Sequence, residues 1–194
     1  ERILVNCAGI GNAMKTASRV RDDNGGLTGE TKHFPLSAFD FVIQVNLVGT
    51  FRCIAQSAAG MLTLDPLSDD GDRGAIVNTA SFWGLRPGPN HPLYVMSKAA
   101  IASLTECLGR DHAHQGIRVN AVCPNEVDTP MLRTGFAQRG LDPTRGIADL
   151  NASVPLGRIA PTQDIADVIL FLASDAARYI CGALVEVHGG KPVG

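Results

Sequence analysis

The stretch Ala75-Ile-Val-Asn-Thr-Ala-Ser81 decides the fold class, together with Ile117-Arg-Val-Asn-Ala-Val122 further along the chain. Both are short, rich in β-branched residues and almost continuously apolar, a pattern typical of parallel strands buried on both faces. Ile3-Leu-Val5 and Ala183-Leu-Val-Glu-Val187 have the same character. Longer segments with apolar residues at helical spacing lie between these runs, over residues 36–62, 94–113 and 164–174. The alternation predicts an α/β fold with a parallel sheet and right-handed crossovers.

Composition narrows the class of protein. The chain has 194 residues, 45% of them hydrophobic, and a formal net charge of −2, which indicates a single globular domain over residues 1–194. There is no run of basic residues, so the sequence predicts no nucleic-acid partner and no anionic membrane surface. Apolar stretches such as 165–173 are expected to be too short and too interrupted to span a bilayer. The chain opens on Glu1 and shows no signal peptide, which we interpret as a domain without its N-terminal part.

The cysteines are too scattered for a metal site or a disulfide framework. Their number is odd, and no Cys-x-x-Cys or cysteine–histidine pair at metal-ligand spacing occurs. The sequence therefore predicts no bound metal and a reducing, cytoplasmic location. The five cysteines are Cys7, Cys53, Cys107, Cys123 and Cys181.

Two segments are interpreted as loops. Residues 21–33 are polar and contain Asn24-Gly-Gly26, which predicts a surface excursion. Residues 129–155 mix glycine, proline and charged residues and are long for a connection. Long connections in compact domains are usually binding loops, so we expect a lid over the substrate here, with a disordered excursion as the alternative.

Three residues could carry acid–base chemistry. Tyr94 and Lys98 are four residues apart at the start of an expected helix, so both point from one face. An ammonium beside a phenol favours the phenolate and lowers a pKa that is about 10 when unperturbed. The hydroxyl of Ser81 could donate to a carbonyl oxygen beside Tyr94. On spacing alone, however, a Tyr-x-x-x-Lys pair is more often an ordinary helix surface.

The context of these residues changes that balance. Asn78-Thr-Ala-Ser81, followed by Tyr94-Val-Met-Ser-Lys98, resembles the active-site signature of the short-chain dehydrogenase/reductase family. The resemblance extends along the whole chain as an ordered series of motifs. These further motifs are Asn6-Cys-Ala-Gly9, Val45-Asn-Leu-Val-Gly-Thr-Phe51, Arg118-Val-Asn-Ala-Val-Cys-Pro124, Val127-Asp-Thr129, Pro155-Leu-Gly-Arg158, Asp164-Ile-Ala166, Phe171-Leu-Ala-Ser174 and Gly189-Gly190.

The resemblance implies a fold, a reaction and residue roles. The fold is a Rossmann-type doubly wound parallel sheet in three α/β/α layers, and the reaction interconverts a secondary alcohol and a ketone with NAD or NADP. Tyr94 is implied as the acid/base, and Ser81 as the hydrogen-bond partner of the substrate oxygen. Lys98 is implied to bind the nicotinamide ribose and lower the Tyr94 pKa, and Asn46 to hold a water behind Lys98. Further implied cofactor contacts are Asn6, Ala8, Gly9, Tyr94, Pro124, Asn125, Val127 and Thr129.

The family also implies assembly as a homotetramer or homodimer, through the long helices and the C-terminal strand.

Two departures from the family's sequence pattern stand out. Asn125 replaces the glycine of the usual Pro-Gly pair, although asparagine tolerates left-handed conformations. Gly9-Ile-Gly11 looks like the start of the glycine-rich phosphate turn, but Met14 occupies the third glycine position. We therefore interpret Gly9-Ile-Gly11 as the loop after the family's fourth strand, so that the pyrophosphate and adenosine cradle is missing.

Three residues are candidates for substrate contact. Trp83 directly follows Ser81 and could line a pocket, or belong to the core or a subunit interface. His91 could contact substrate or form the turn between Pro89 and Pro92. Glu126, beside Asn125, adds polar groups that favour a polyol or sugar alcohol, whereas the residues before Ser81 resemble the hydroxyacyl-CoA branch of the family. A rival interpretation is a truncated or non-catalytic homologue with a structural or binding role, against which the complete set of four catalytic residues speaks.

Overall fold

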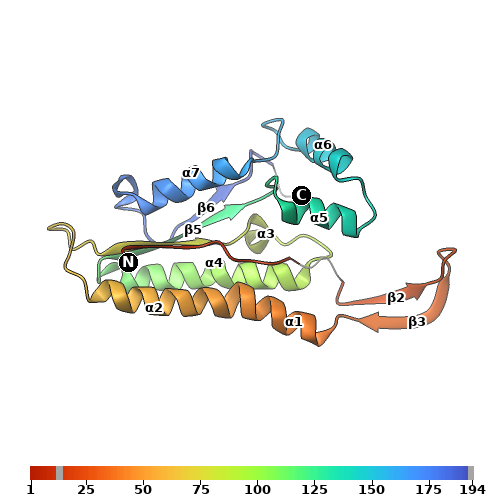
Figure 1. Ribbon diagram of the computed structural model, residues 1–194, viewed down its shortest axis with the longest axis horizontal. Helices are drawn as coiled ribbons and strands as arrows, with labels where there is room; N and C mark the ends of the chain where they lie inside the picture. The colour runs from red at the N-terminus through yellow and green to blue at the C-terminus, as the bar shows by residue number, and fades with distance from the viewer. Residues whose placement is uncertain (12–14, 192–194) are drawn as a thin grey trace.

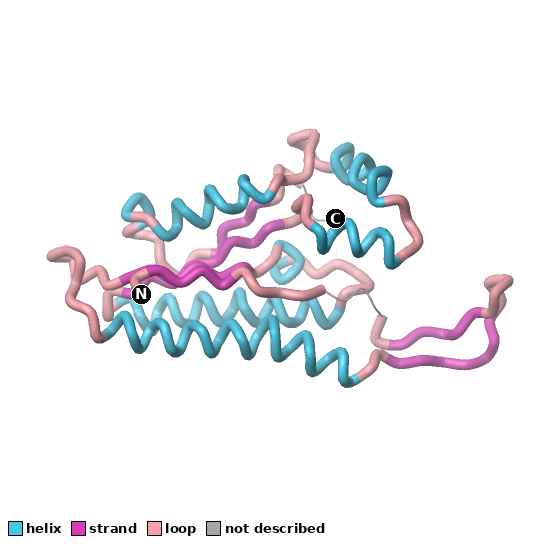
Figure 2. The backbone as a smooth tube through the Cα atoms, viewed as in Figure 1, coloured by secondary structure: helices cyan, strands magenta, loops and turns pink. Residues whose placement is uncertain are grey.

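The computed structural model describes residues 1–11 and 15–191, so the comparison that involves Met14 lies outside the described residues. Four parallel strands form one sheet in the order β1-β4-β5-β6 (Figures 1 and 2). They are β1 (Ile3–Asn6), β4 (Gly74–Thr79), β5 (Ile117–Pro124) and β6 (Leu184–Val187). These are the four apolar runs of the sequence, and the predicted parallel α/β fold is confirmed.

Helices cover both faces of this sheet because successive strand residues point to opposite sides. On one face, Ile76 packs with Ile54 of α2 (Thr50–Leu62) and Leu104 of α4 (Pro92–Ala113). On the other face, Val77 packs with Leu172 of α7 (Thr162–Ala173). The three layers are visible in Figure 1. Two short turns, α3 (Phe82–Leu85) and the 3-10 helix η2 (Asp175–Ala177), complete this part of the domain.

The longest apolar helix is continuous from Leu36 to Leu62. It comprises α1 (Leu36–Ile43), a π-helical segment η1 (Gln44–Gly49) and α2. By length and composition alone it could cross a membrane, so the expectation that every apolar stretch is too short was wrong for this segment. Ile54, Ala58 and Met61 on one side of this helix are buried against the sheet, so core packing accounts for part of its apolar character.

Residues 17–33 form a hairpin and not the loop that their polarity predicted. Strand β2 (Ala17–Arg21) pairs antiparallel with β3 (Leu27–His33), and the hairpin extends away from the sheet and helices (Figures 1 and 2). The turn is stabilised by Asp22, whose Oδ1 accepts hydrogen bonds from the backbone N–H groups of Asn24 and Gly26 at 2.9 and 2.8 Å. The predicted surface excursion is confirmed, whereas its predicted irregular backbone was wrong.

Residues 129–155 are also more regular than predicted, because they contain α5 (Pro130–Gln138) and α6 (Pro143–Ser153). Each helix begins with a proline in its first turn, preceded by a capping side chain. Thr129 Oγ1 accepts from the Leu132 N–H, and Asp142 Oδ1 accepts from the Thr144 N–H. The two helices lie beyond the carboxyl ends of β5 and β6 (Figure 1). A lid role for them stays a prediction.

Candidate active site

Ser81 and Tyr94 meet at the carboxyl edge of the sheet. Ser81 follows β4 and caps α3, its Oγ accepting a hydrogen bond from the Trp83 N–H at 3.2 Å and donating to the Pro124 carbonyl at 3.4 Å. The Ser81 hydroxyl lies close enough to Tyr94, in the first turn of α4, to lower the pKa of its phenol. The two hydroxyls therefore present one polar site at the place where ligands of open α/β sheets bind.

Lys98 lies one helical turn after Tyr94 and is only 5% exposed. Its Nζ donates to the Thr79 carbonyl at 2.7 Å and lies 5.9 Å from the centroid of the Tyr94 ring. Two glycines make room for it. A Cβ on Gly9 would lie 3.3 Å from Lys98 Nζ, and one on Gly84 would lie 2.7 Å from the Lys98 carbonyl carbon. The loop after β1 and helix α3 can therefore come close to this turn of α4 because these residues lack a side chain.

Asn46 connects the loop after β1 to α4. It is almost fully buried in the π-helical segment, and its amide makes two hydrogen bonds with Ile10, one from the Ile10 N–H at 2.8 Å and one to the Ile10 carbonyl at 2.9 Å. Its Nδ2 also donates to Ser97 Oγ at 3.0 Å, and Ser97 Oγ donates to the Tyr94 carbonyl at 2.8 Å. Ser97 was not predicted from the sequence, because a serine inside a helix carries no signal of its own. π-helical segments occur frequently at functional sites.

Burial shifts the pKa values of this site in directions that spacing did not predict. Loss of hydration raises the pKa of Tyr94 above its usual 10.0, although the nearby Ser81 hydroxyl opposes this. The same cause lowers the pKa of Lys98 to about 8. The prediction of a lowered Tyr94 pKa was therefore wrong for this chain. The rise comes from burial, and the Lys98 ammonium, which donates to the Thr79 carbonyl and lies 5.9 Å from the ring centroid, is not among the groups that lower this pKa.

The residues expected to hold the cofactor fall into two groups. Ala8 and Gly9 lie in the loop beside Asn46 and Lys98, whereas Asn6 donates its side-chain amide to Asn78 at 2.9 Å and so stabilises the β1–β4 pair. The second group, Pro124, Asn125, Val127 and Thr129, forms the connection from β5 to α5.

The backbone of this second group is held by neighbouring segments. The Asn125 N–H donates to the Val187 carbonyl at 3.1 Å, and Val127 pairs with Ala160. Among the described residues other than glycine, only Asn90 has a positive φ, of 67°. Asn125 therefore has an ordinary backbone conformation, and no glycine is required at its position.

These residues fit a nicotinamide riboside. Lys98 has three N–H donors, and within the described residues only one of them is used, by the Thr79 carbonyl. The remaining donors of a buried ammonium are suited to a pair of ribose hydroxyls. The open Cβ position of Gly9 leaves the space beside Lys98 Nζ free of side-chain atoms from that loop.

Trp83 and His91 are brought together next to Ser81. Their rings are edge to face, with centroids 4.9 Å apart. His91 also forms the predicted turn contact, because its Nδ1 lies 3.1 Å from the Pro89 carbonyl oxygen and it directly precedes α4. Both rings are half-buried, so they can form one wall of a substrate site.

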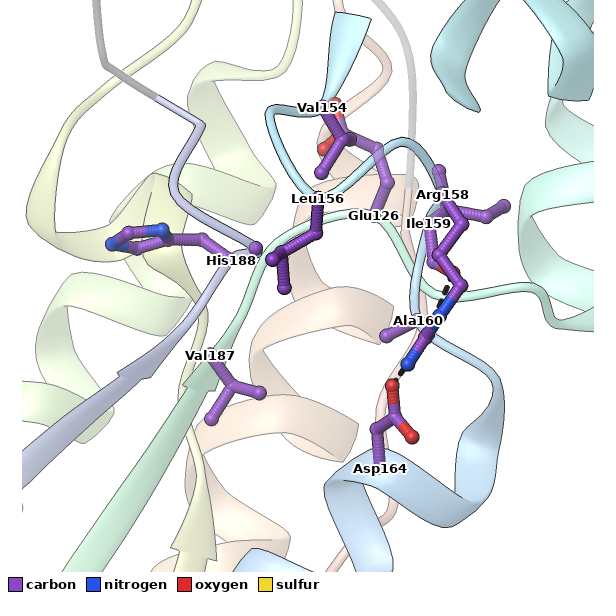
Figure 3. Close-up of a pocket in the computed structure, with 10 residues that line it drawn as sticks. Glu126, Val154, Leu156, Arg158, Ile159, Ala160, Asp164, Val187 and His188 are labelled. Carbon is purple, nitrogen blue, oxygen red and sulfur yellow. Dashed lines mark hydrogen bonds and ion pairs between the residues drawn. The ribbon is translucent and has the colours of Figure 1, made fainter. Parts of the chain in front are cut away.

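Glu126 is not brought to that wall. It faces a separate cavity of about 80 Å³, where its Oε1 forms an ion pair with Lys191 Nζ at 2.6 Å. Arg158 and Asp164 form a second ion pair at the same cavity, also at 2.6 Å (Figure 3). Among the described residues that line this cavity are none of the four catalytic candidates, and neither Trp83 nor His91. The lining residues are Glu126, Val154, Leu156, Arg158, Ile159, Ala160, Asp164, Val187, His188 and Gly189.

Comparison with known proteins places this geometry in a family. The sequence profile described as enoyl-(acyl carrier protein) reductase matches residues 2–191. The (3R)-3-hydroxyacyl-CoA dehydrogenase of Mus musculus is 35% identical over 188 residues, which cover 97% of this chain and 62% of that protein. The chain spans 61 to 64% of the length of three further curated relatives that it matches, which are fungal short-chain dehydrogenases.

Solved structures agree with the sequence match. The ligand-free aldohexose dehydrogenase of Thermoplasma acidophilum superimposes with a TM-score of 0.79 at 28% identity, covering 97% of this chain and 67% of that one. ElxO with NADP bound superimposes with a TM-score of 0.73 at 26% identity, covering 98% and 66%. The ordered motifs, the sheet and the profile match over nearly the whole chain lead to one conclusion: the chain belongs to the short-chain dehydrogenase/reductase family.

Proposed function

We propose that this protein interconverts a secondary alcohol and a ketone with NAD or NADP. The observation that carries the proposal is the convergence of Ser81, Tyr94 and Lys98 at one edge of the sheet, with Asn46 behind them. Relatives named for oxidation of a 3-hydroxyacyl-CoA and of an aldohexose support this class of reaction. A non-catalytic homologue would have no use for all four residues.

The chain's own residues hold the reactants. The nicotinamide group supplies or accepts the hydride when it is bound. Lys98 would hold the ribose with its free N–H donors, and the connection from Pro124 to Thr129 would hold the nicotinamide. The neighbour ElxO, solved with NADP bound, supports a nicotinamide cofactor. The cofactor that raises the Tm of the full-length protein more at equal concentration identifies the preference between NAD and NADP.

Tyr94 would transfer the proton, and Ser81 would orient the substrate oxygen that receives or loses it. Because the pKa of Tyr94 is raised, its hydroxyl is protonated near neutral pH and can donate to the substrate oxygen during ketone reduction. Ser81 orients that oxygen beside Tyr94 through its own hydroxyl. In the opposite direction Tyr94 must first lose its proton, so alcohol oxidation is favoured by higher pH. Asn46 fixes the loop after β1 against α4, and its role in holding a relay water stays part of this proposal.

Glu126 gives no support for a polyol substrate, because its carboxylate is paired with Lys191 in another cavity. The 3-hydroxyacyl class, which the mouse relative's name supports, is the stronger of the two substrate classes. A sugar alcohol is the second, supported by the aldohexose dehydrogenase neighbour. The aromatic wall formed by Trp83 and His91 would contact either substrate near its carbinol carbon.

We extend the proposal to assembly and location. A homodimer or homotetramer is supported by large apolar side chains that remain exposed on the long helices, such as Phe41, Phe51 and Leu170. A cytoplasmic location without a membrane or nucleic-acid partner is supported by the net charge of −2 and by five cysteines that are all free.

The test is binding and turnover of the full-length protein. A ligand that binds only the folded state at about 100-fold its Kd adds roughly 2.7 kcal/mol of stability, so the preferred nicotinamide cofactor should raise the Tm measurably. Reduction of a ketone panel, comprising acetoacetyl-CoA, an uncharged β-keto ester and a ketose, would be followed by the loss of NADH or NADPH absorbance. A protein with no thermal shift and no turnover with either cofactor would contradict the proposed function.

A further inference from the structure

The β2–β3 hairpin has one strongly cationic face. Lys15, which precedes β2, and Arg19 and Arg21 within β2 are all exposed. Together with Ala17, Ser18 and Leu27 they line an open hollow of about 590 Å³. This volume is within the roughly 300–1,000 Å³ of small-molecule sites. We call Lys15, Arg19 and Arg21 the cationic face.

The acidic residues of the hairpin do not neutralise this face. In the part of the chain that the structure describes, none of the three cations forms an ion pair. The Asp22 carboxylate accepts hydrogen bonds from the N–H groups of the turn. Glu30 is not among the described residues that line the hollow. The Arg21 guanidinium donates one hydrogen bond to Gly25 and keeps its other donors free.

The cationic face begins close to Tyr94. A Cβ on Gly11 would lie 4.0 Å from Tyr94 Cδ2, so the chain passes directly beside the catalytic ring there. Lys15 follows four residues later and is therefore no more than about 14 Å away along the chain. From Lys15 to Arg21 the extended chain spans roughly another 20 Å. A ligand that reaches both places must be elongated, with its reacting carbon at one end and its negative charges at the other.

We propose that the cationic face binds the phosphate groups of an elongated substrate whose ketone or alcohol lies at Tyr94. Arginine presents a planar fork of N–H donors that matches phosphate oxygens, and lysine adds a point charge. Thioesters of coenzyme A have this architecture, with the acyl group and the phosphates at opposite ends. The inference rests on the proposed function, which it deepens by assigning a binding surface to the phosphates of the substrate. A two-stranded hairpin is only marginally stable alone, so the bound phosphates would also order it.

The first experiment measures binding of coenzyme A itself, which carries the phosphates but no reacting carbonyl. The variant Lys15→Gln/Arg19→Gln/Arg21→Gln of the full-length protein is compared with Lys32→Gln/Arg52→Gln/Arg110→Gln. The control removes the same charge from exposed positions outside the cationic face. The first variant should weaken binding at least about tenfold, because each exposed charge pair is worth up to roughly fivefold in affinity. The control should stay within about twofold of wild type once salt is matched.

Equal binding by wild type and the first variant would overturn the proposal, as would equal weakening by both variants. Binding is repeated with saturating NADH or NADPH, because the cofactor also carries phosphates. If the cofactor displaces coenzyme A from the hairpin, the cationic face belongs to the cofactor, and the proposal fails.

The second experiment separates this inference from the proposed function. The ratio of kcat/KM for acetoacetyl-CoA to kcat/KM for an uncharged β-keto ester should fall at least about tenfold in the first variant. A protein that reduces the uncharged ester, yet shows no preference for the coenzyme A thioester, retains the proposed function and refutes the inference. A protein that binds coenzyme A through the hairpin but reduces no ketone supports the inference on binding and refutes the function. Preference for a substrate on an acyl carrier protein over one on coenzyme A would also refute the inference, because the cationic face would then bind a protein surface.

Discussion

Lys98 Nζ donates a 2.7 Å hydrogen bond to the carbonyl oxygen of Thr79, the last residue of β4. This contact fixes the ammonium on the sheet side of α4, 5.9 Å from the centroid of the Tyr94 ring. The ammonium is thus nearly enclosed by protein, with one carbonyl as its partner among the described residues. The cost of burying the charge is visible in its pKa, which burial lowers to about 8.

A first prediction concerns stability and pH. The pKa of Lys98 is about 8 in the folded chain and 10.5 for a free lysine, so between these values the unfolded state binds more protons and stability rises with pH. The full difference corresponds to about 3 kcal/mol. Lys98→Met, which cannot titrate, should lack this rise. Urea unfolding of both proteins at pH 7 and pH 9.5 checks it. Parallel pH profiles would show that Lys98 is not desolvated.

A second prediction concerns the close approach of α3 to α4. A Cβ on Gly84 would lie 2.7 Å from the Lys98 carbonyl carbon and 2.9 Å from the Ala99 nitrogen, and neither backbone atom can move alone. Gly84→Ala should therefore destabilise the protein by about 1–3 kcal/mol and lower kcat, because Ser81 caps α3. Gly60→Ala in α2 is the matched control, since nothing lies within 4 Å of its Cβ. It should be neutral or stabilise by up to about 1 kcal/mol. If urea unfolding showed the same loss of unfolding free energy in Gly84→Ala and Gly60→Ala, close packing at Gly84 would not explain the loss.

The elements predicted most successfully from the sequence are those that are buried on every side. The run at 75–77 is apolar on both sides because Ile76 and Val77 face different helical layers, and such a run has no exposed side to obscure it. The hairpin at 17–33 was missed because β3 is exposed along its whole length and has no apolar alternation. Helix α6 was missed for a related reason, because none of its residues is buried.

The site divides in the same way. The contact between Ser81 and Tyr94 follows from motifs that have a fixed place on the fold. The direction of the Tyr94 pKa does not, because it depends on how much water the finished fold excludes. The predicted substrate contact of Glu126 was wrong because its carboxylate pairs with Lys191, a residue 65 positions away in the sequence. No local pattern can identify such a partner.

A third prediction tests the link between Asn46 and α4. Ser97→Ala removes the acceptor of the Asn46 Nδ2 hydrogen bond and leaves that buried donor with the Ile10 carbonyl alone. We expect a loss of about 1–2 kcal/mol in the free energy of unfolding. A positioning role predicts more than this, namely a lower kcat with an unchanged KM. Ser103→Ala, on the exposed side of the same helix, is the control. A stability loss with normal kcat would make Ser97 purely structural.

A fourth prediction addresses the proposed lid formed by α5 and α6. Arg139 directly follows α5 and leads into the short connection to Asp142, so trypsin should cut the free protein there. Cofactor together with substrate should slow this cleavage if the helices close over them. Mass spectrometry of the fragments identifies the bond, and cleavage after the exposed Arg52 on α2 serves as the internal control. Equal rates at Arg139 with and without ligands would remove the lid hypothesis.

The last prediction concerns Tyr94 itself. Tyr94→Phe removes the hydroxyl beside Ser81 but leaves the ring, so folding and cofactor affinity should be retained. Turnover should fall by at least the roughly 10²–10⁴-fold that a positioned acid or base contributes. Tyr179→Phe is the natural control, because Tyr179 is the other of the two tyrosines and is fully exposed. Lys98→Ala should differ from both by weakening cofactor binding as well.

The same enzyme gives a pH test of the acid–base role. Because burial raises the pKa of Tyr94, oxidation of an alcohol by wild type should increase with pH as the base form becomes populated. In Tyr94→Phe the remaining activity should lose this dependence. Steady-state kinetics on one accepted alcohol from pH 6 to pH 10, with the Tm recorded at each pH, measures both effects. Near-normal turnover in Tyr94→Phe would make Tyr94 an ordinary residue of α4, and the proton would have to come from another group.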